Sequence, residues 1–251
     1  MNGFDSWLEY MSDERDDVLE LTIEHATIVL QVMAAAIIFS VVVGVVVQNR
    51  PALRNIALSI ASVFLTIPSL ALFTLFIPVF GIGKWPVRVA LFMYALLPIL
   101  RNTVTGLDGI DPAVEESAKG MGMSPTRRLF QVKLPLAWPV IVTGIRVAFL
   151  LVTGIAAIAT LVNGGGLGDL IKVGFNRLGL PNSLEPIWAG AVMVVVLALA
   201  FDLVLALLQK LLSPRVLAAG SELPSTLISG LRSRSSSDPA HQEGTRVRTD
   251  R

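Results

Sequence analysis

The chain has 251 residues, of which 53% are hydrophobic and only 16% are charged, and its mean hydropathy is +0.70. Soluble domains carry about 25% charged residues, so this composition indicates an integral membrane protein of the cell membrane. The net charge of +1 gives no indication of nucleic-acid binding. The chain has no cysteine and only two histidines, His25 and His241, so we expect no disulfide, no metal site and no cofactor.

Five segments are apolar enough to cross a bilayer as helices, which takes about 20 residues each. They are residues 26–47, 56–79, 87–100, 137–161 and 187–212. The third is short and can extend through Asn102 and Thr103, and the second contains Pro68 and Pro78, so a break there would give six spans. The predicted fold is an all-α bundle of five transmembrane helices, or six, over residues 26–212.

Residues 1–25 precede the first apolar segment and are acidic, whereas a signal peptide begins with a basic region. Lys and Arg gather after the first, third and fifth segments, and basic loops lie on the cytoplasmic side. We therefore expect an extracytoplasmic N-terminus and a cytoplasmic C-terminus. The four tryptophans fall at the ends of the predicted spans, as expected for anchors at the membrane interface: Trp7, Trp85, Trp138 and Trp188.

The largest cytoplasmic loop, about residues 105–136, is predicted to form two short helices. Asp111-Pro112 and Ser124-Pro125 are helix starts, because Ser or Asp caps the free N–H groups and Pro fits the first turn. We expect the second helix to end at Leu134-Pro135. Between the two helices lies a corner with Gly120, Met121, Gly122 and Met123. Methionines suit an adaptable contact surface, so the loop is either a docking site for a protein or a solvated connection.

The same loop resembles the EAA motif of ABC-importer permeases, which reads Glu-Ala-Ala, three residues, Gly, nine residues, Ile, one residue, Leu-Pro. The matching positions are Glu116, Ser117, Ala118, Gly122, Val132, Leu134 and Pro135, with Ser117 in place of Ala and Val132 in place of Ile. The resemblance implies a type I importer core whose coupling loop docks on a separate ATPase subunit. It also implies a second permease copy or a paralogue, and an extracytoplasmic substrate-binding protein.

Three further stretches, 66–83, 96–113 and 163–171, resemble permeases that import osmoprotectant quaternary amines. That resemblance implies a substrate such as glycine betaine, carnitine or choline; another small solute such as an amino acid is the alternative. Quaternary ammonium groups are usually held in aromatic cages. Only two tyrosines, Tyr10 and Tyr94, are present, so the high-affinity site is expected on the binding protein.

Two features inside or between the spans are open to two interpretations each. The run Gly164–Gly166 lacks the Lys-Ser/Thr of a nucleotide-binding loop. It is either a tight or re-entrant turn, or an outer gate or contact for the binding protein. Pro68 and Ser69 mark either a packing kink or a wall of the translocation path.

Arg146 and Asp202 are two charges within predicted spans. Each lies nine or ten residues from the cytoplasmic end of its span, about 15 Å deep at 1.5 Å per residue. An unpaired charge there costs about 2.5–3.5 kcal/mol or more. We expect the two side chains to pair; the alternative is that Arg146 reaches the interface and Asp202 lines a wet cavity.

No nucleophile–base pair or acidic dyad is present, so catalysis by this chain is not expected. The rival interpretation is a secondary transporter driven by an ion gradient, which places acidic residues within its spans; a structural membrane scaffold is a third. Residues 213–251 are rich in Ser and Arg and poor in aliphatic residues, which predicts a largely disordered cytoplasmic tail that contacts membrane lipid or is simply solvated.

Overall fold

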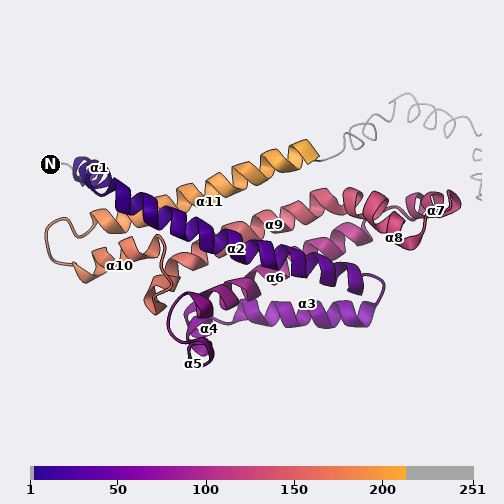
Figure 1. The fold of residues 1–251 in the computed structure, drawn as a ribbon, viewed down its shortest axis with the longest axis horizontal. Coiled ribbons are helices and arrows are strands. Elements are labelled where there is room, and N and C mark those ends of the chain that lie inside the picture. Colours follow the sequence, from indigo (N-terminus) through magenta and orange to yellow (C-terminus); the bar gives the residue numbers. More distant parts are fainter. Residues whose placement is uncertain (1–2, 213–251) are drawn as a thin grey trace, which may run out of the picture. The chain divides into compact units, whose positions relative to one another are not determined.

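The computed structural model describes residues 3–212, and the predicted tail 213–251 lies outside the described residues. Within the described part, all regular elements are helices (Figure 1). Four of them are long and apolar enough to cross a membrane: α2 (Arg15–Val47), α6 (Lys84–Asp108), α9 (Leu134–Ala156) with its continuations, and α11 (Glu185–Leu212). The prediction of an all-α membrane bundle is confirmed.

The second predicted span is a bent pair. Helix α3 (Pro51–Thr66) is followed by α4 (Ser69–Leu75) and α5 (Ile77–Phe80), and the two halves meet at an angle of 102°. The break falls at Ile67, whose backbone is extended, because Pro68 disfavours a helical residue before it and has no N–H to donate. The Tyr94 hydroxyl donates to the carbonyl oxygen of Ile67 and so satisfies a group that the helix has lost. The bundle reaches five spans when this pair is counted as one.

Two helices extend beyond the apolar segments that predict the spans. Helix α2 begins at Arg15, upstream of the apolar segment that starts near residue 26, and it follows α1 (Gly3–Asp13) almost directly. The acidic residues do not end the helix because Asp16, Asp17 and Glu20 all lie on exposed faces of it. Helix α6 is longer than the predicted third span at both ends, because its polar ends continue the helix outside the apolar stretch.

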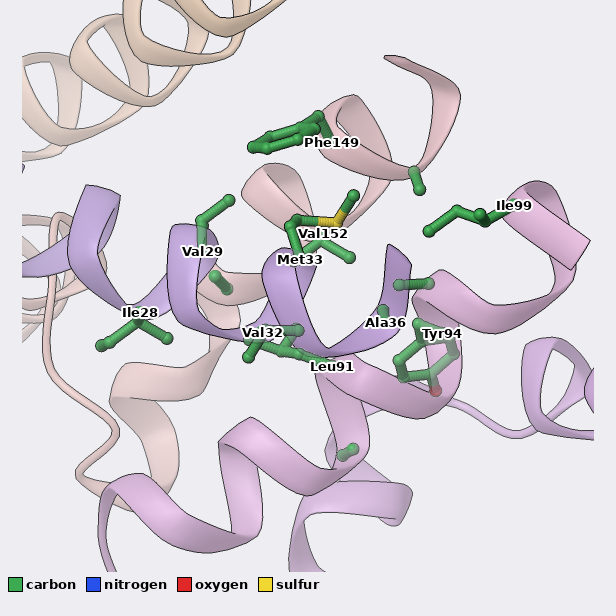
Figure 2. Packing of buried hydrophobic residues seen from close by; sticks show 14 of the residues in the cluster. Ile28, Val29, Val32, Met33, Ala36, Leu91, Tyr94, Ile99, Phe149 and Val152 are labelled. Carbon is green, nitrogen blue, oxygen red and sulfur yellow. The ribbon is translucent and has the colours of Figure 1, made fainter. Parts of the chain in front are cut away.

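The core forms where α2, α6 and α9 pack together (Figure 2). Val29, Met33, Leu91 and Val152 are fully buried there. Small residues allow the helices to approach closely: a β-carbon on Gly144 of α9 would lie 2.6 Å from the carbonyl oxygen of Pro98 in α6. These three helices therefore form a tightly packed unit that carries the loops at both ends.

The two ends of this helical unit differ in chemistry. At one end, α7 (Pro112–Gly120) and α8 (Pro125–Arg128) lie beyond the turn between α2 and α3 (Figure 1), and Arg54 pairs there with Asp108 at 2.5 Å. At the opposite end, the glycine run follows the 3-10 segment η2 (Ala157–Val162) and leads into α10 (Gly168–Asn176). We call these the coupling-loop end and the glycine-loop end.

Candidate functional site: the coupling loop and two polar clusters

The coupling loop contains the two predicted helix starts. The Asp111 carboxylate accepts a hydrogen bond from the Ala113 N–H at 2.8 Å at the start of α7. The Ser124 hydroxyl oxygen accepts from the Arg127 N–H at 3.4 Å at the start of α8. Both caps satisfy N–H groups that a helix leaves free in its first turn, so each short helix has its own local start signal.

The corner between the helices depends on one glycine. Gly120 is the last residue of α7, and Gly122 has a φ of +76°, in the region that side chains with a β-carbon rarely adopt. The Met123 N–H then donates to the Ala118 carbonyl at 3.2 Å and closes the turn. Nothing lies within 4 Å of a β-carbon added at Gly122, so its side faces open space.

The predicted end of the second helix at Leu134-Pro135 is wrong. A π-helical turn, η1 (Leu129–Lys133), joins α8 directly to α9, and Leu134 and Pro135 form the first turn of α9. The wider π turn changes the hydrogen-bond register just before Pro135, whose ring would clash with a regular α-helical backbone. The second half of the coupling loop is therefore continuous with a membrane-spanning helix.

The surface of the loop combines polar motif residues with exposed apolar side chains. Glu116 and Ser117 are exposed and Ala118 is buried, whereas Val132, Leu134 and Pro135 are partly buried. Met121 is 69% exposed and Phe130 is 63% exposed, which is unusual for large apolar side chains in a solvated loop. Sequence reasoning missed two exposed apolar residues of the loop, Phe130 and the half-exposed Val114. Phe130 could have been found as an aromatic residue in a charged loop.

An ion pair fastens the two halves of the loop together. The Lys133 ammonium lies 3.4 Å from the Glu115 carboxylate, and the Lys133 side chain is only 13% exposed. This contact joins α7 to the π turn. The start of α9 is therefore connected to α7 by a charged contact as well as by the backbone.

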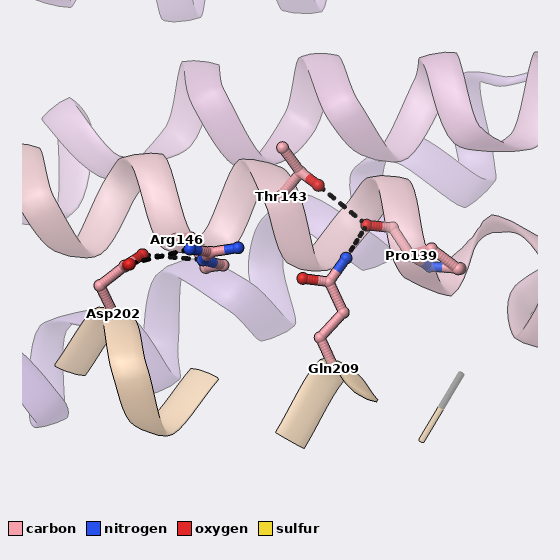
Figure 3. A network of polar contacts seen from close by, with 5 residues as sticks. All are labelled: Pro139, Thr143, Arg146, Asp202 and Gln209. Atoms are coloured by element: carbon pink, nitrogen blue, oxygen red, sulfur yellow. Dashed lines mark hydrogen bonds and ion pairs between the residues drawn. The ribbon is translucent and has the colours of Figure 1, made fainter. Parts of the chain in front are cut away.

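Arg146 and Asp202 form a bidentate ion pair (Figure 3). The Arg146 Nε donates to one carboxylate oxygen at 2.7 Å, and Nη2 donates to the other at 2.8 Å. The two side chains are 33% and 27% exposed. Two turns away, the Gln209 amide donates to the Pro139 carbonyl at 3.1 Å, so α11 is held against α9 by two polar contacts on one seam.

Pro68 and Ser69 lie at the break between α3 and α4. Pro68 is exposed and precedes α4, and its carbonyl accepts from the Leu72 N–H at 3.0 Å. Ser69 is partly buried. They lie on a different element from the Arg146–Asp202 pair, and their role in the translocation path stays a prediction.

The glycine-loop end holds a second polar cluster that sequence reasoning missed. Glu24 pairs with Lys84 and also accepts from the Gly166 N–H at 2.8 Å. Its neighbour His25 is buried; one ring nitrogen lies 3.1 Å from the Thr153 carbonyl, and the other accepts from the Leu167 N–H at 3.3 Å. A Glu-His dipeptide at the edge of an apolar segment was the available signal.

The glycine run forms a tight turn against this cluster. Gly165 and Gly166 have φ values of +80° and +82°. A β-carbon on Gly165 would lie 2.7 Å from the Glu24 carboxylate, so only glycine allows the loop to come this close. The run is a tight turn, linked to α2 and, through Lys84, to α6. Its further role as an outer gate or a contact for the binding protein stays a prediction.

Known proteins share both the sequence and this architecture. Residues 34–217 match the family described as "Binding-protein-dependent transport system inner membrane component". The chain is 41% identical to the choline transport system permease protein OpuBB of Bacillus subtilis, over 82% of this chain and 94% of that protein. It is 39% identical to the osmoprotectant import permease protein OsmW of Salmonella typhimurium, over 83% and 97%.

A similar fold is found in solved structures. A chain of the MetNI methionine ABC transporter in an inward-facing conformation matches 78% of this chain and 96% of its own length, with a TM-score of 0.68 and 21% identity. At that identity the likeness concerns the fold alone. The chain belongs to the family of inner membrane components of binding-protein-dependent transport systems.

Proposed function

We propose that this chain is the transmembrane permease subunit of an ATP-driven importer for quaternary-amine osmoprotectants such as glycine betaine, carnitine or choline. The names of its relatives support the substrate class: choline for OpuBB, and glycine betaine, carnitine and choline for OpuCB of Bacillus subtilis, which is 38% identical. The observation that carries the transport mechanism is the coupling loop, an exposed pair of helices continuous with a membrane-spanning helix.

The mechanism follows from that continuity. The coupling loop docks on a separate ATPase subunit through Glu116, Ser117, the glycine corner and the exposed side chains of Met121 and Phe130. When the ATPase subunits close on ATP, the loop moves, and the helical connection through the π turn carries the motion into α9. Two permease chains, identical or paralogous, form the channel. A binding protein delivers substrate at the glycine-loop end.

In this proposal the chain has no catalytic role. ATP hydrolysis belongs to the separate ATPase subunit, and high-affinity recognition belongs to the extracytoplasmic binding protein. The permease domain is residues 26–212, with its coupling loop at 105–136, preceded by an extracytoplasmic segment and followed by a cytoplasmic tail at 213–251. Among the described residues, no group of three or more His, Asp or Glu side chains could hold a metal ion.

Reconstitution tests the proposed function. Proteoliposomes that contain the chain, its ATPase and its binding protein should accumulate radiolabelled glycine betaine or choline only when ATP is supplied on the ATPase side. Omitting the ATPase should abolish uptake. Uptake that follows an imposed proton or sodium gradient without ATP would instead support the rival secondary transporter.

A labelling experiment tests the predicted topology. The chain has no native cysteine, so Asp13→Cys and Thr126→Cys introduce single thiols at exposed positions on the two ends. In intact cells or right-side-out vesicles, a membrane-impermeant maleimide should label position 13, whereas position 126 should react only after permeabilisation. The reverse pattern would invert the orientation, and equal labelling of both from outside would contradict the odd number of spans.

A further inference from the structure

A cavity of about 490 Å³ lies at the glycine-loop end, beneath the turn at Gly165. Its charged lining consists of two carboxylates and two ammonium groups, from Glu24, Asp169, Lys84 and Lys172. Asn163 and Asn176 add amide groups. The volume is within the range of small-molecule sites, about 300–1,000 Å³. The formal charge of the lining is zero, but charges of both signs are present. Such a lining is complementary to a zwitterion, which carries one positive and one negative charge.

The four charged groups are not equivalent. Glu24 and Lys84 pair with each other, and Glu24 also holds the Gly166 N–H. Neither Asp169 nor Lys172 forms an ion pair among residues 3–212. The Lys172 ammonium contacts only neutral oxygens, the Asn163 side chain at 3.2 Å and the Thr160 carbonyl at 3.5 Å. One cation and one anion on the cavity wall are therefore left without charged partners.

Asp169 and Lys172 place one negative and one positive side chain close together on the cavity wall. They are three residues apart on α10, so they lie on the same face of the helix with about 5–6 Å between their β-carbons. The Asp169 carboxylate accepts from the Thr160 hydroxyl, which fixes its orientation. An ammonium group donates three hydrogen bonds and binds a carboxylate strongly, whereas a carboxylate attracts a quaternary cation by charge alone.

We propose that this cavity is a low-affinity receiving site for a small zwitterion, with the carboxylate of the ligand on Lys172 and its fixed cation near Asp169. The inference rests on the proposed function for its biological role, but it concerns binding by this chain itself. The site distinguishes two kinds of ligand: a ligand with both charges uses both residues, whereas a purely cationic ligand uses only Asp169.

Glycine betaine and choline are a matched pair of probes, because both carry a trimethylammonium group and only glycine betaine carries a carboxylate. The full chain, purified without its binding protein, is placed in nanodiscs of phosphatidylethanolamine and phosphatidylglycerol, which lack trimethylammonium protons. Saturation-transfer NMR on the methyl signal of each probe then measures binding directly. Glycine betaine should give a saturable signal with the native chain.

Three variants separate the roles. Lys172→Gln should weaken glycine betaine binding about tenfold and leave choline binding within about twofold, because it removes one charge-assisted contact. Lys172→Arg should restore most of the loss. Asp169→Asn should weaken both probes. Lys210→Gln, which removes a lysine charge at the far end of α11, is the control and should change neither. A normal size-exclusion profile shows that each variant is folded.

Each result decides the matter. The receiving site would be overturned if the native chain gave no saturable glycine betaine signal. It would also be overturned if Lys172→Gln left the binding of both probes unchanged, or weakened the binding of both equally. The proteoliposome uptake assay decides the proposed function separately. Binding of glycine betaine in nanodiscs without ATP-driven transport would support the site and contradict the importer role. ATP-driven transport without binding in nanodiscs would support the importer role and contradict the site.

Discussion

Gly122→Asp should abolish ATP-driven uptake while leaving the chain in the membrane. Gly122 has a φ of +76°, and a β-carbon there would meet nothing within 4 Å. Aspartate is one of the few residues that tolerate this backbone region, so the corner itself should survive. A carboxylate placed in a packed docking surface must give up its hydration, which should weaken association of the ATPase at least about tenfold. Co-purification of the ATPase and uptake in proteoliposomes measure both effects.

Gly179→Asp is the matched control. Gly179 also has a positive φ, +90°, and open space around its β-carbon, but it lies between α10 and α11 at the glycine-loop end. It should keep normal ATPase association. If Gly122→Asp associates with the ATPase and transports as well as this control does, the glycine corner does not contact the ATPase.

Removing both partners of the Arg146–Asp202 pair should damage assembly less than the sum of the two single losses. Arg146→Ala leaves the Asp202 carboxylate unpaired inside a membrane-spanning helix, and Asp202→Ala leaves the Arg146 guanidinium unpaired in the same way. Each unpaired charge costs about 2.5–3.5 kcal/mol. The double variant leaves no charge unpaired. A coupling energy of about 0.5–3 kcal/mol is therefore expected from a double-mutant cycle, measured as thermal or denaturant stability in detergent micelles.

Gln209→Leu is the control for that cycle, because it removes the neighbouring α9–α11 hydrogen bond without creating an unpaired charge. Its loss should be smaller and should add to that of Arg146→Ala. Strictly additive losses for Arg146→Ala and Asp202→Ala would show that each charge is satisfied independently, and would remove the pair as the element that fixes α11 against α9.

The membrane helices, the helix caps and the break before α4 are predictable from sequence, because each depends on residues close together in the chain. The apolar segments predict membrane helices because transfer of their side chains out of water dominates their free energy. The caps at Asp111 and Ser124 are correct because each bonds a backbone N–H two or three residues away. The break before α4 follows from the fixed geometry of Pro68.

Helix ends are less well encoded by local sequence. Hydropathy marks only the apolar part of the first span, from about residue 26, whereas α2 begins upstream, because a helix continues through acidic residues when they face outward. Likewise, Pro135 normally predicts a helix end, yet a π turn before it lets the chain continue into α9. In both cases the surroundings of the backbone outweighed the local propensity.

The sequence by itself determined the membrane class of the protein, the approximate apolar segments, the coupling-loop motif and the similar distances of Arg146 and Asp202 from the ends of their segments, since each of these depends on residue type and spacing. Only the tertiary structure decided which groups meet. The contact of Glu24 with Gly166 and Lys84, and the cavity that Asp169 and Lys172 share with them, join segments far apart in the chain. The reason is physical: packing of α2, α6 and α9 brings their ends together, and no local pattern encodes that distance.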